Sequence, residues 1–590
     1  MRNRPQLPLL NDFKLSFALL LTALLPSAAI VAAEAELKAW TVAETRHVLR
    51  SELPGTNTTA ILHGARNEWV DFQILLRSDT PVSGVGVEAE DLKEPGGAVL
   101  PRAGVRLYRE HQLHLEVGTY RNDTFKPDWY PDPLIPFVHP VTGKKLEAAR
   151  LVAVPFDLPP NETHGFWVDL HVPTNATPGE YHGVYHVSAD HNRARDIPVS
   201  LTVWNFTLPQ TPALVTAFES PRLWDYYQQR TKTAHEPEPS DWATVDAQCA
   251  QMLSEHCFNA VPPRELPAPK KQSDGSYQIP ARQVQALREF VDRYHVNALQ
   301  TPHPASAVKD PVAQRETLHA WLAAFNRAAK ELDRPQVLFY TYLKDEPNSL
   351  EDYRYVQKWG RAVRAAQSVV KVLVVEQPWT EPGLDGADSA WGDLYGAVDI
   401  WCPLFSLHRQ EAAAKRQALG ETIWTYTALC QGPPTPWWEI DFPLLNYRVP
   451  AWMAWRDGMK GLLYWGGMSY WRETADPWTE APYYVGNGQR QQGKKGIIFN
   501  GEGSLVYPAR AVGYDGVVPT IRLKALRDSM QDYDYLIILQ RLGKGAEAQK
   551  IVRSLTESFF QWNKDPKAYE QARLKLAEMI IAAENQPTTR

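Results

Sequence analysis

The sequence predicts a multidomain protein with an N-terminal antiparallel β-sandwich, a central (β/α)8 TIM-type barrel and a helical C-terminal cap. Short strands separated by Pro, Gly and Asn fill the first part of the chain, with no long amphipathic helix among them. An alternation of strand, loop and helix follows, with eight candidate strands over about 260 residues. The boundaries we expect are a signal peptide at 1–35, the sandwich at 36–208, the barrel at 209–500 and the helical region at 501–590.

The composition is that of a globular protein with an excess of aromatic residues. Of the 590 residues, 44% are hydrophobic and 22% are charged. The net charge of -6 includes no basic excess, which argues against nucleic acid and anionic membranes as partners. The 21 Trp and 25 Tyr favour a carbohydrate ligand, because flat rings stack on the C–H faces of sugars, although such residues also fill ordinary cores.

The first 35 residues have the pattern of a secretory signal peptide. Arg2, Arg4 and Lys14 precede an apolar run that begins at Leu15, and small residues then lead to a cleavage site near position 33 or 35. An uncleaved anchor is the alternative. No later segment has the length and apolarity of a membrane span. We therefore expect export to a periplasm or out of the cell.

Four cysteines are few for an exported chain of this length. Cys249 and Cys257 flank a short helical segment, and Cys402 and Cys430 lie near two consecutive strand ends. Either pair could form a disulfide. No Cys and His spacing is typical of zinc, so we expect no metal or other cofactor.

Residues 36–208 contain the alternating stretches expected of the sandwich, at 69–77, 165–172 and 181–187. Asn67 and Glu68 stand just before the first of them. They are either ligand-binding residues or a buried polar pair that fixes a turn.

The barrel is predicted to begin after a Pro-containing linker at 208–212. Amphipathic segments between the strands, such as 281–294, 315–332 and 350–366, have apolar residues at helical spacing. The eight expected strands are Leu214–Phe218, Asn259–Val261, Val296–Thr301, Val337–Asp345, Val372–Glu376, Val398–Leu404, Thr422–Ala428 and Gly461–Gly466.

After about position 503 the chain is predicted to be helical, including 521–528 and 533–542. The Arg and Asp residues of these segments are expected to form a solvated or salt-bridged face rather than a catalytic one.

The fourth expected strand ends in two adjacent carboxylates, Asp345 and Glu346, followed by Pro347. Proline cannot donate to a ladder, so the strand stops there. The C-terminal strand ends of a (β/α)8 barrel form the active face, so this position suits catalytic acids. A salt-bridged pair at a strand-to-loop junction is the structural alternative.

Glycosidic cleavage usually needs two separated carboxylates, and adjacent residues are an awkward source of them. The segment 425–431 after the seventh strand has no carboxylate, which argues against a nucleophile there. Substrate assistance, in which the 2-acetamido oxygen of the sugar attacks, suits adjacent acids better. Glu346 would then be the general acid and later the base, and Asp345 would orient the acetamide and stabilise the oxazolinium.

Further residues could complete a sugar-binding site. Eleven of the 21 Trp lie between positions 379 and 478. Those expected near strand ends, as a stacking wall, are Trp379, Trp401, Trp424, Trp465 and Trp471. Tyr426 is a candidate to bind the acetamido oxygen. Glu376 and Glu219 also end strands, and either could be a conventional nucleophile or a ligand for sugar hydroxyls.

Taken together, several motifs resemble glycoside hydrolase family 123. They are the segments 64–68 and 72–73, Asp345-Glu346-Pro347, 461–465, 507–508, 521–528 and 531–535. The resemblance covers nearly the whole mature chain. It implies a β-sandwich followed by a (β/α)8 barrel, and β-N-acetylgalactosaminidase activity by substrate-assisted retention. The catalytic Asp and Glu of the family correspond to Asp345 and Glu346.

Three hypotheses follow. The first is an exported β-N-acetylhexosaminidase, most simply galactosamine-specific, that acts on glycans or glycolipid headgroups. The second is a glycosidase on a sugar without the acetamido group, with Glu376 or Glu219 as the second carboxylate. The third is a carbohydrate-binding protein without activity, against which the presence of both Asp345 and Glu346 argues.

Overall fold

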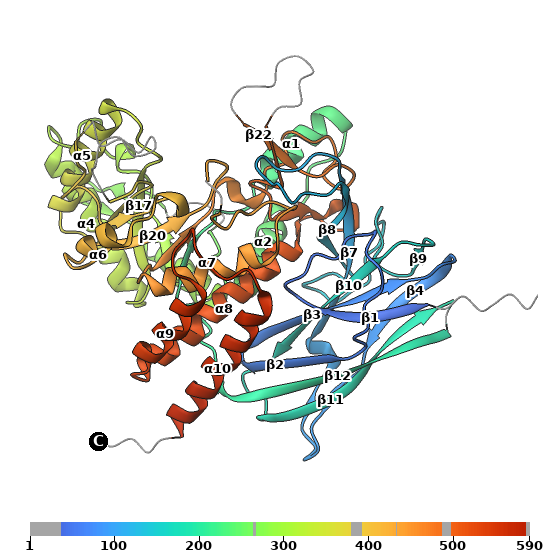
Figure 1. Ribbon diagram of the computed structural model, residues 1–590. Coiled ribbons are helices and arrows are strands. Elements are labelled where there is room, and N and C mark those ends of the chain that lie inside the picture. The colour runs from blue at the N-terminus through green and yellow to red at the C-terminus, as the bar shows by residue number, and fades with distance from the viewer. Residues whose placement is uncertain are drawn as a thin grey trace, which may run out of the picture.

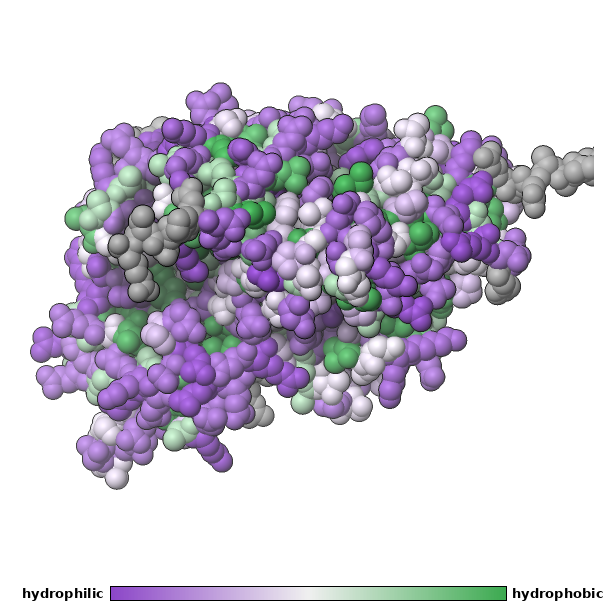
Figure 2. Space-filling model, turned by 90° about the horizontal axis from the view of Figure 1, so that it is seen from below, coloured by the Kyte–Doolittle hydropathy of each residue, from purple (hydrophilic) through white to green (hydrophobic). Residues whose placement is uncertain are grey.

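The structure is a computed structural model that describes residues 37–190, 192–262, 267–378, 392–431, 434–486 and 497–585. Figure 1 shows the N-terminal sheets on one side, the parallel strands with their helices on the other, and the C-terminal helices between and below them. On the face drawn in Figure 2, hydrophilic residues predominate and apolar residues are scattered in small groups.

Two largely antiparallel sheets form the N-terminal part. The first has the order β1 (Lys38–Ala43), β3 (Glu68–Arg77), β10 (His164–Val172), β7 (Val105–Leu115) and β8 (Asp128–Pro136). The second has the order β2 (Ala60–Arg66), β12 (Asn192–Thr207), β11 (Gly179–Ala189), β4 (Val82–Ala89) and β9 (Phe156–Leu158), with β5 (Leu92–Lys93) and β6 (Val99–Leu100) beside it. Alternate residues of both sheets pack into one apolar cluster, for example Phe72 and Ile74 of β3 with Val199 and Leu201 of β12.

The turn between β2 and β3 explains the polar pair at 67–68. Asn67 adopts a left-handed backbone with φ 63°, and its side chain donates to the carbonyls of Leu208 and Pro209. Glu68 is buried and accepts from the Ala65 amide at 2.6 Å. The interpretation as a polar pair that fixes a turn is supported, with Glu68 buried and Asn67 half-buried.

Seven parallel strands form a nearly closed barrel. Their order is β13 (Val215–Ala217), β21 (Gly461–Leu463), β20 (Thr422–Tyr426), β19 (Ile400–Trp401), β18 (Val370–Val374), β17 (Leu338–Lys344) and β16 (Ala298–Gln300). Helices connect or follow these strands: α1 (Leu223–Ala234), α2 (Trp242–Glu255), α3 (Ala281–Tyr294), α4 (Arg315–Leu332), α5 (Leu350–Ala365), α6 (Gln410–Gln417) and α7 (Leu445–Arg456). In α4, for instance, the residues at positions 318, 321, 322, 325 and 332 are buried, which is the expected helical spacing.

Of the eight strands predicted for the barrel, the second, at Asn259–Val261, is wrong, since this segment forms no strand in the structure. It runs between β13 and β16. The side-chain amide of Asn259 links the two strands by hydrogen bonds, in place of the backbone hydrogen bonds of a strand pair. Its Nδ2 donates to the Thr216 carbonyl at 3.0 Å and to Asn297 Oδ1 at 2.8 Å. Its Oδ1 accepts from the Asn297 backbone amide at 2.9 Å. Proline at position 262 then prevents further pairing.

Three short hairpins complete the sheet structure of the described residues: β14 (Lys270–Lys271) with β15 (Tyr277–Gln278), β22 (Tyr483–Val485) with β23 (Ile498–Asn500), and β24 (Val506–Pro508) with β25 (Val517–Pro519).

The chain ends in helices α8 (Ile521–Arg541), α9 (Gly545–Leu555) and α10 (Pro566–Glu584). Helix α8 packs on α7 of the barrel and on β8 of the first sheet, so it is buried on nearly all sides. Its cations pair with carboxylates of the N-terminal sheets, at side chains no more than 1% exposed. These pairs are Arg522 with Asp132, Lys524 with Asp169, and Arg527 with both Asp71 and Asp169. The predicted salt-bridged face is confirmed, but the face is buried and not solvated.

All four cysteines are free thiols, so neither Cys249–Cys257 nor Cys402–Cys430 forms the disulfide considered above. Across the described ranges, no helix combines the length and the apolarity that crossing a bilayer requires. The predicted signal peptide lies outside the described residues.

Candidate active site

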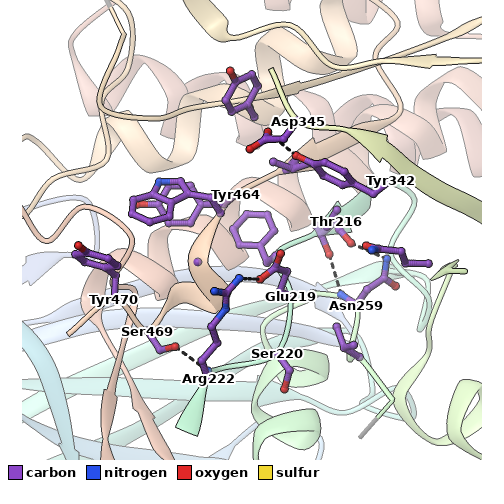
Figure 3. A pocket seen from close by; sticks show the side chains of 18 of the residues that line it. Thr216, Glu219, Ser220, Arg222, Asn259, Tyr342, Asp345, Tyr464, Ser469 and Tyr470 are labelled. Carbon is purple, nitrogen blue, oxygen red and sulfur yellow. Dashed lines mark hydrogen bonds and ion pairs between the residues drawn. The ribbon is translucent and has the colours of Figure 1, made fainter. Parts of the chain in front are cut away.

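The C-terminal strand ends of the barrel open into a cavity of about 1220 Å³. Residues of β13, β16, β17, β20 and β21 line it, together with the loops that follow these strands. Figure 3 shows part of this lining, with Asp345, Tyr342, Glu219 and Arg222 projecting toward one space. This is the face on which barrel enzymes bind their substrates.

Asp345 lies directly after β17 and lines the cavity. The Tyr342 hydroxyl donates to its Oδ1 at 2.8 Å (Figure 3). Burial raises the pKa of Tyr342, and the charge of Asp345 raises it further. The phenol therefore keeps its proton and remains a donor to the carboxylate.

Glu346 also lines the cavity, and its backbone is left-handed with φ 35°. Pro347 follows it and excludes the ordinary helical conformation at Glu346. The Tyr426 hydroxyl, at the end of β20, donates to Glu346 Oε1 at 2.5 Å. Burial, and next the charge of Glu346, raises the pKa of Tyr426 well above its ordinary value. Each acid thus receives a hydrogen bond from a protonated tyrosine.

Glu376 follows β18 but does not line the cavity, and it is buried. Burial raises its pKa to about 7, while the amide of Gln377 opposes this shift. The charge of Glu346 also raises the pKa of Glu376, so the two carboxyl groups are near one another. Glu376 consequently lies behind the cavity wall.

Glu219 lines the cavity from the end of β13. Its backbone is left-handed with φ 59°, and its Oε2 accepts from Arg222 Nη2 at 2.8 Å (Figure 3). Its charge raises the pKa of Tyr340 and of Tyr342, in each case after the larger effect of burial. Glu219 and Asp345 therefore face the same space.

The tryptophans expected near strand ends fall into two groups. Trp465 and Trp471 line the cavity. Trp401 and Trp424 do not line it, because both are fully buried; Trp401 donates to Glu421 at 2.6 Å, and Trp424 packs against Gly461. A stacking contact with substrate is excluded for these two by their position. Trp379 lies outside the described residues.

No metal site is found in the part of the chain that the structure describes, since no three His, Cys, Asp or Glu residues there gather closely enough to hold an ion. The side chains that line the cavity offer carboxyl groups, phenols and aromatic faces, together with guanidinium and imidazole groups.

Comparison with known families agrees with this arrangement. Residues 307–539 match "Glycoside hydrolase 123, catalytic domain", and residues 40–189 match "Glycoside hydrolase 123 N-terminal domain". The chain belongs to glycoside hydrolase family 123. The catalytic-domain match contains Asp345, Glu346, Glu376 and Tyr426, and it extends through most of α8.

Among the similar solved structures, one shows the fold that this family 123 glycoside hydrolase shares. A family 123 glycoside hydrolase from Clostridium perfringens, described in terms of glycolipid glycan hydrolysis, has a TM-score of 0.61 and 14% identity, covering 93% of this chain and 97% of its own. An endo-β-1,6-glucanase has a TM-score of 0.29 and 9% identity, covering 55% and 76%. A β-1,4-D-mannanase from Cryptopygus antarcticus has a TM-score of 0.26 and 11% identity, covering 48% and 87%. No curated protein matches the sequence.

Sequence reasoning missed several residues of the family 123 cavity. Tyr342 could have been found, because it stands on the same strand three positions before Asp345. Behind the lining, the buried Glu502 had no sequence signal; it accepts from the indole N–H of the lining residue Trp465 at 2.5 Å. The other missed lining residues with polar or aromatic side chains include Arg222, Tyr226, His303, Tyr470, Arg472 and Tyr484.

Proposed function

We propose that this family 123 protein is a retaining β-N-acetylgalactosaminidase that uses the 2-acetamido group of its substrate as the nucleophile. The observation that carries the proposal is that Asp345 and Glu346, adjacent in sequence, both line the cavity, each with a tyrosine hydroxyl on its carboxylate. Adjacent acids fit a mechanism in which one serves the acetamide and the other the glycosidic oxygen.

In the first step, the acetamido carbonyl oxygen attacks C1 of the sugar and the bond from C1 to the glycosidic oxygen breaks. Glu346 gives its proton to the departing oxygen. Asp345 accepts a hydrogen bond from the acetamide N–H and stabilises the positive oxazolinium that results. In the second step, water attacks C1, Glu346 takes a proton from that water, and the oxazolinium ring opens with retention at C1.

The two tyrosines would keep these acids in place. The Tyr342 hydroxyl on Asp345 and the Tyr426 hydroxyl on Glu346 fix the carboxyl groups before the substrate arrives. Tyr426, expected above to bind the acetamido oxygen, is proposed here to hold Glu346 in the free protein. Trp465, which is only partly buried, would offer aromatic surface to the sugar, whereas Trp471 is almost fully covered.

The cavity supports a substrate longer than one sugar. Its volume of about 1220 Å³ is larger than the roughly 300–1,000 Å³ typical of small-molecule pockets. An oligosaccharide headgroup of a glycolipid, or a glycan end, fits this size. The similar Clostridium perfringens structure, described for glycolipid glycan hydrolysis, supports the same class of substrate.

We further propose that the protein is exported before it acts, as the basic residues and apolar run of its first 35 residues suggest. N-terminal sequencing of the protein recovered from periplasm or medium should find a chain that begins near position 34 or 36. A full-length chain retained in the membrane would contradict this.

The variants Glu346→Gln and Asp345→Asn test the proposed roles on 4-nitrophenyl N-acetyl-β-galactosaminide. Loss of the general acid should lower kcat by about 10² to 10⁴, and loss of Asp345 should lower it comparably. A thiazoline that mimics the bicyclic intermediate should inhibit the wild type. Full activity in either variant, with no inhibition by the thiazoline, would refute the proposal.

A second candidate is a conventional glycosidase with Glu219 as nucleophile, favoured by the position of Glu219 in the cavity. It predicts that Glu219→Ala is inactive and that azide restores turnover with formation of a glycosyl azide. Glu376 is a weaker partner for Glu346 in this scheme, because it does not line the cavity.

A further inference from the structure

The backbone at Glu219 is strained without any local reason in its sequence. Its φ of 59° lies in the left-handed region, which costs a non-glycine residue free energy and persists only where the surroundings enforce it. Such strain is concentrated at sites of function. The residue before it, Phe218, is buried, and the strand β13 ends just ahead of both.

The neighbouring strand end packs against the segment that begins at Glu219. After β21, which pairs with β13, three successive residues are also left-handed: Gly466, Gly467 and Met468. Gly467 packs so closely on the Ser220 carbonyl that a side chain there would collide with it. Ser469 then accepts from the Arg222 backbone amide at 2.8 Å (Figure 3). The segment after β21 therefore packs on, and hydrogen-bonds to, residues 219–222 after β13.

The result is a carboxylate that is held on one side and open on the other. Arg222 binds Oε2 of Glu219 at 2.8 Å, which fixes the direction of the carboxylate. Within the described part of the chain, Oε1 has no hydrogen-bond partner, and the Glu219 side chain is 50% exposed to the cavity. A carboxylate can accept about four hydrogen bonds, so most of its capacity is unused.

The proposed function leaves specific groups of the sugar for this carboxylate. With the acetamide at C2 on Asp345 and the glycosidic oxygen at C1 on Glu346, the hydroxyls at C3, C4 and C6 remain. The hydroxyls at C3 and C4 are vicinal, so they present two donors that one carboxylate can accept together. Galactosamine and glucosamine differ only at C4, so such a contact would distinguish them.

We propose that Glu219, oriented by Arg222, accepts hydrogen bonds from the C3 and C4 hydroxyls of the terminal sugar and sets the preference for the galacto configuration. The inference rests on the proposed function. It assigns to Glu219 a specificity-determining contact and not the role of nucleophile.

A substrate pair isolates this contact. Wild type and Glu219→Gln are compared on 4-nitrophenyl N-acetyl-β-galactosaminide and on its 4-deoxy analogue. On the parent substrate, Glu219→Gln should lower kcat/KM by about 10- to 100-fold, as expected for hydrogen bonds to a charged acceptor. On the 4-deoxy analogue, the same substitution should lower kcat/KM by a clearly smaller factor, because the wild type has already lost the C4 contact and keeps only the contact with the C3 hydroxyl.

Two further variants complete the design. Glu219→Gly also removes the carboxylate but relieves the left-handed strain, so it should lose the same specificity while its Tm does not fall. Glu578→Gln is the matched control, because Glu578 pairs with Lys575 three positions away at 3.1 Å on α10, outside the residues that line the cavity. This substitution should leave kcat/KM unchanged on both substrates.

The possible failures are distinguishable. An equal loss of kcat/KM on both substrates would overturn the proposed contact. Complete inactivity of Glu219→Gln on both substrates would instead favour Glu219 as the nucleophile. No change on the parent substrate would also overturn it. A wild type that hydrolyses neither substrate would overturn the proposed function and this inference together.

Discussion

The two acids at the end of β17 each receive a hydrogen bond from a tyrosine, half-buried in the case of Tyr342 and buried in the case of Tyr426. Tyr342 comes from the same strand as Asp345, and Tyr426 comes from β20. Burial keeps both phenols protonated, because it raises their pKa values. The geometry of the free protein is thus already suited to holding the acids at fixed positions, which lowers the entropic cost of reaching the transition state.

Removing either hydroxyl should therefore reduce turnover more than binding. We expect Tyr342→Phe and Tyr426→Phe to lower kcat by about 10-fold or more, with a smaller change in KM, because a hydrogen bond to a charged group is lost. Steady-state kinetics on 4-nitrophenyl N-acetyl-β-galactosaminide measures this. Tyr181→Phe is the control, since its hydroxyl bonds only the Thr177 carbonyl in the N-terminal sheets. Unchanged kcat in both test variants would contradict the role assigned to the tyrosines.

Glu376 should make stability depend on pH. Burial raises its folded-state pKa from 4.5 to about 7. Between these two pH values the folded protein keeps a proton that the unfolded chain has lost, so the free energy of unfolding falls as the pH rises, by up to about 3 kcal/mol. Glu376→Gln lacks this effect. Urea unfolding at pH 4.5 and 7.5 should therefore show the wild type losing stability relative to the variant; identical pH dependence in both would contradict the burial of an ionisable Glu376.

At the scale of elements, the barrel is completed by a side chain in place of a strand. The Asn259 amide makes three hydrogen bonds to the groups of Thr216 and Asn297 on either side of it. Both neighbours precede or belong to strands that line the cavity, so Asn259 helps to fix the spacing of β13 and β16. The site depends on this spacing, because Glu219 follows β13 directly.

Loss of this amide should destabilise the barrel. We expect Asn259→Ala to lower the free energy of unfolding by about 2–4 kcal/mol, because three hydrogen bonds are lost and buried partners are left unsatisfied. Urea denaturation measures the change. Asn192→Ala serves as a control, because among the described residues that amide bonds only the Asp190 carbonyl, in an exposed hairpin. A loss no greater than that of the control would show that Asn259 does not join the two strands.

The elements that sequence could predict are those whose signal is local. Seven of the eight expected barrel strands are present, because each is a contiguous apolar run. The acid pair was also found this way, at the end of the strongest run. The missing strand could not be foreseen, since three residues before a proline carry little information and the hydrogen bonds of Asn259 depend on residues about 40 positions away. The burial of Trp401 and Trp424 likewise depends on packing partners that spacing does not reveal.

At the scale of the whole molecule, α8 lies between the N-terminal sheets and the barrel (Figure 1). Buried ion pairs join it to the sheets. From sequence alone, the charges of α8 suggest an exposed helix. The carboxylates that pair with these charges cannot be identified locally, because each is more than 350 positions away. Buried charges are tolerated only when they are paired and hydrogen-bonded. The two parts of the molecule are therefore expected to depend on one another for stability.

Arg527 is the residue that tests this dependence most simply. It pairs with Asp71 and Asp169 of the N-terminal sheets. Arg527→Met should lower the free energy of unfolding by about 3–5 kcal/mol, because it leaves buried carboxyl groups without their cation. The wild type should unfold in a single transition by calorimetry, with both parts melting together. Two separate transitions in the wild type, or a variant of unchanged stability, would contradict the proposed coupling.

The central claim is that the substrate supplies its own nucleophile between Asp345 and Glu346. The most direct measurement compares kcat/KM of the wild type on 4-nitrophenyl N-acetyl-β-galactosaminide and on 4-nitrophenyl β-galactoside, in which a hydroxyl replaces the acetamide. We predict a preference for the acetamido substrate on the order of 10³-fold or more, as expected when an intramolecular nucleophile is removed. Comparable hydrolysis of the two glycosides would contradict the account.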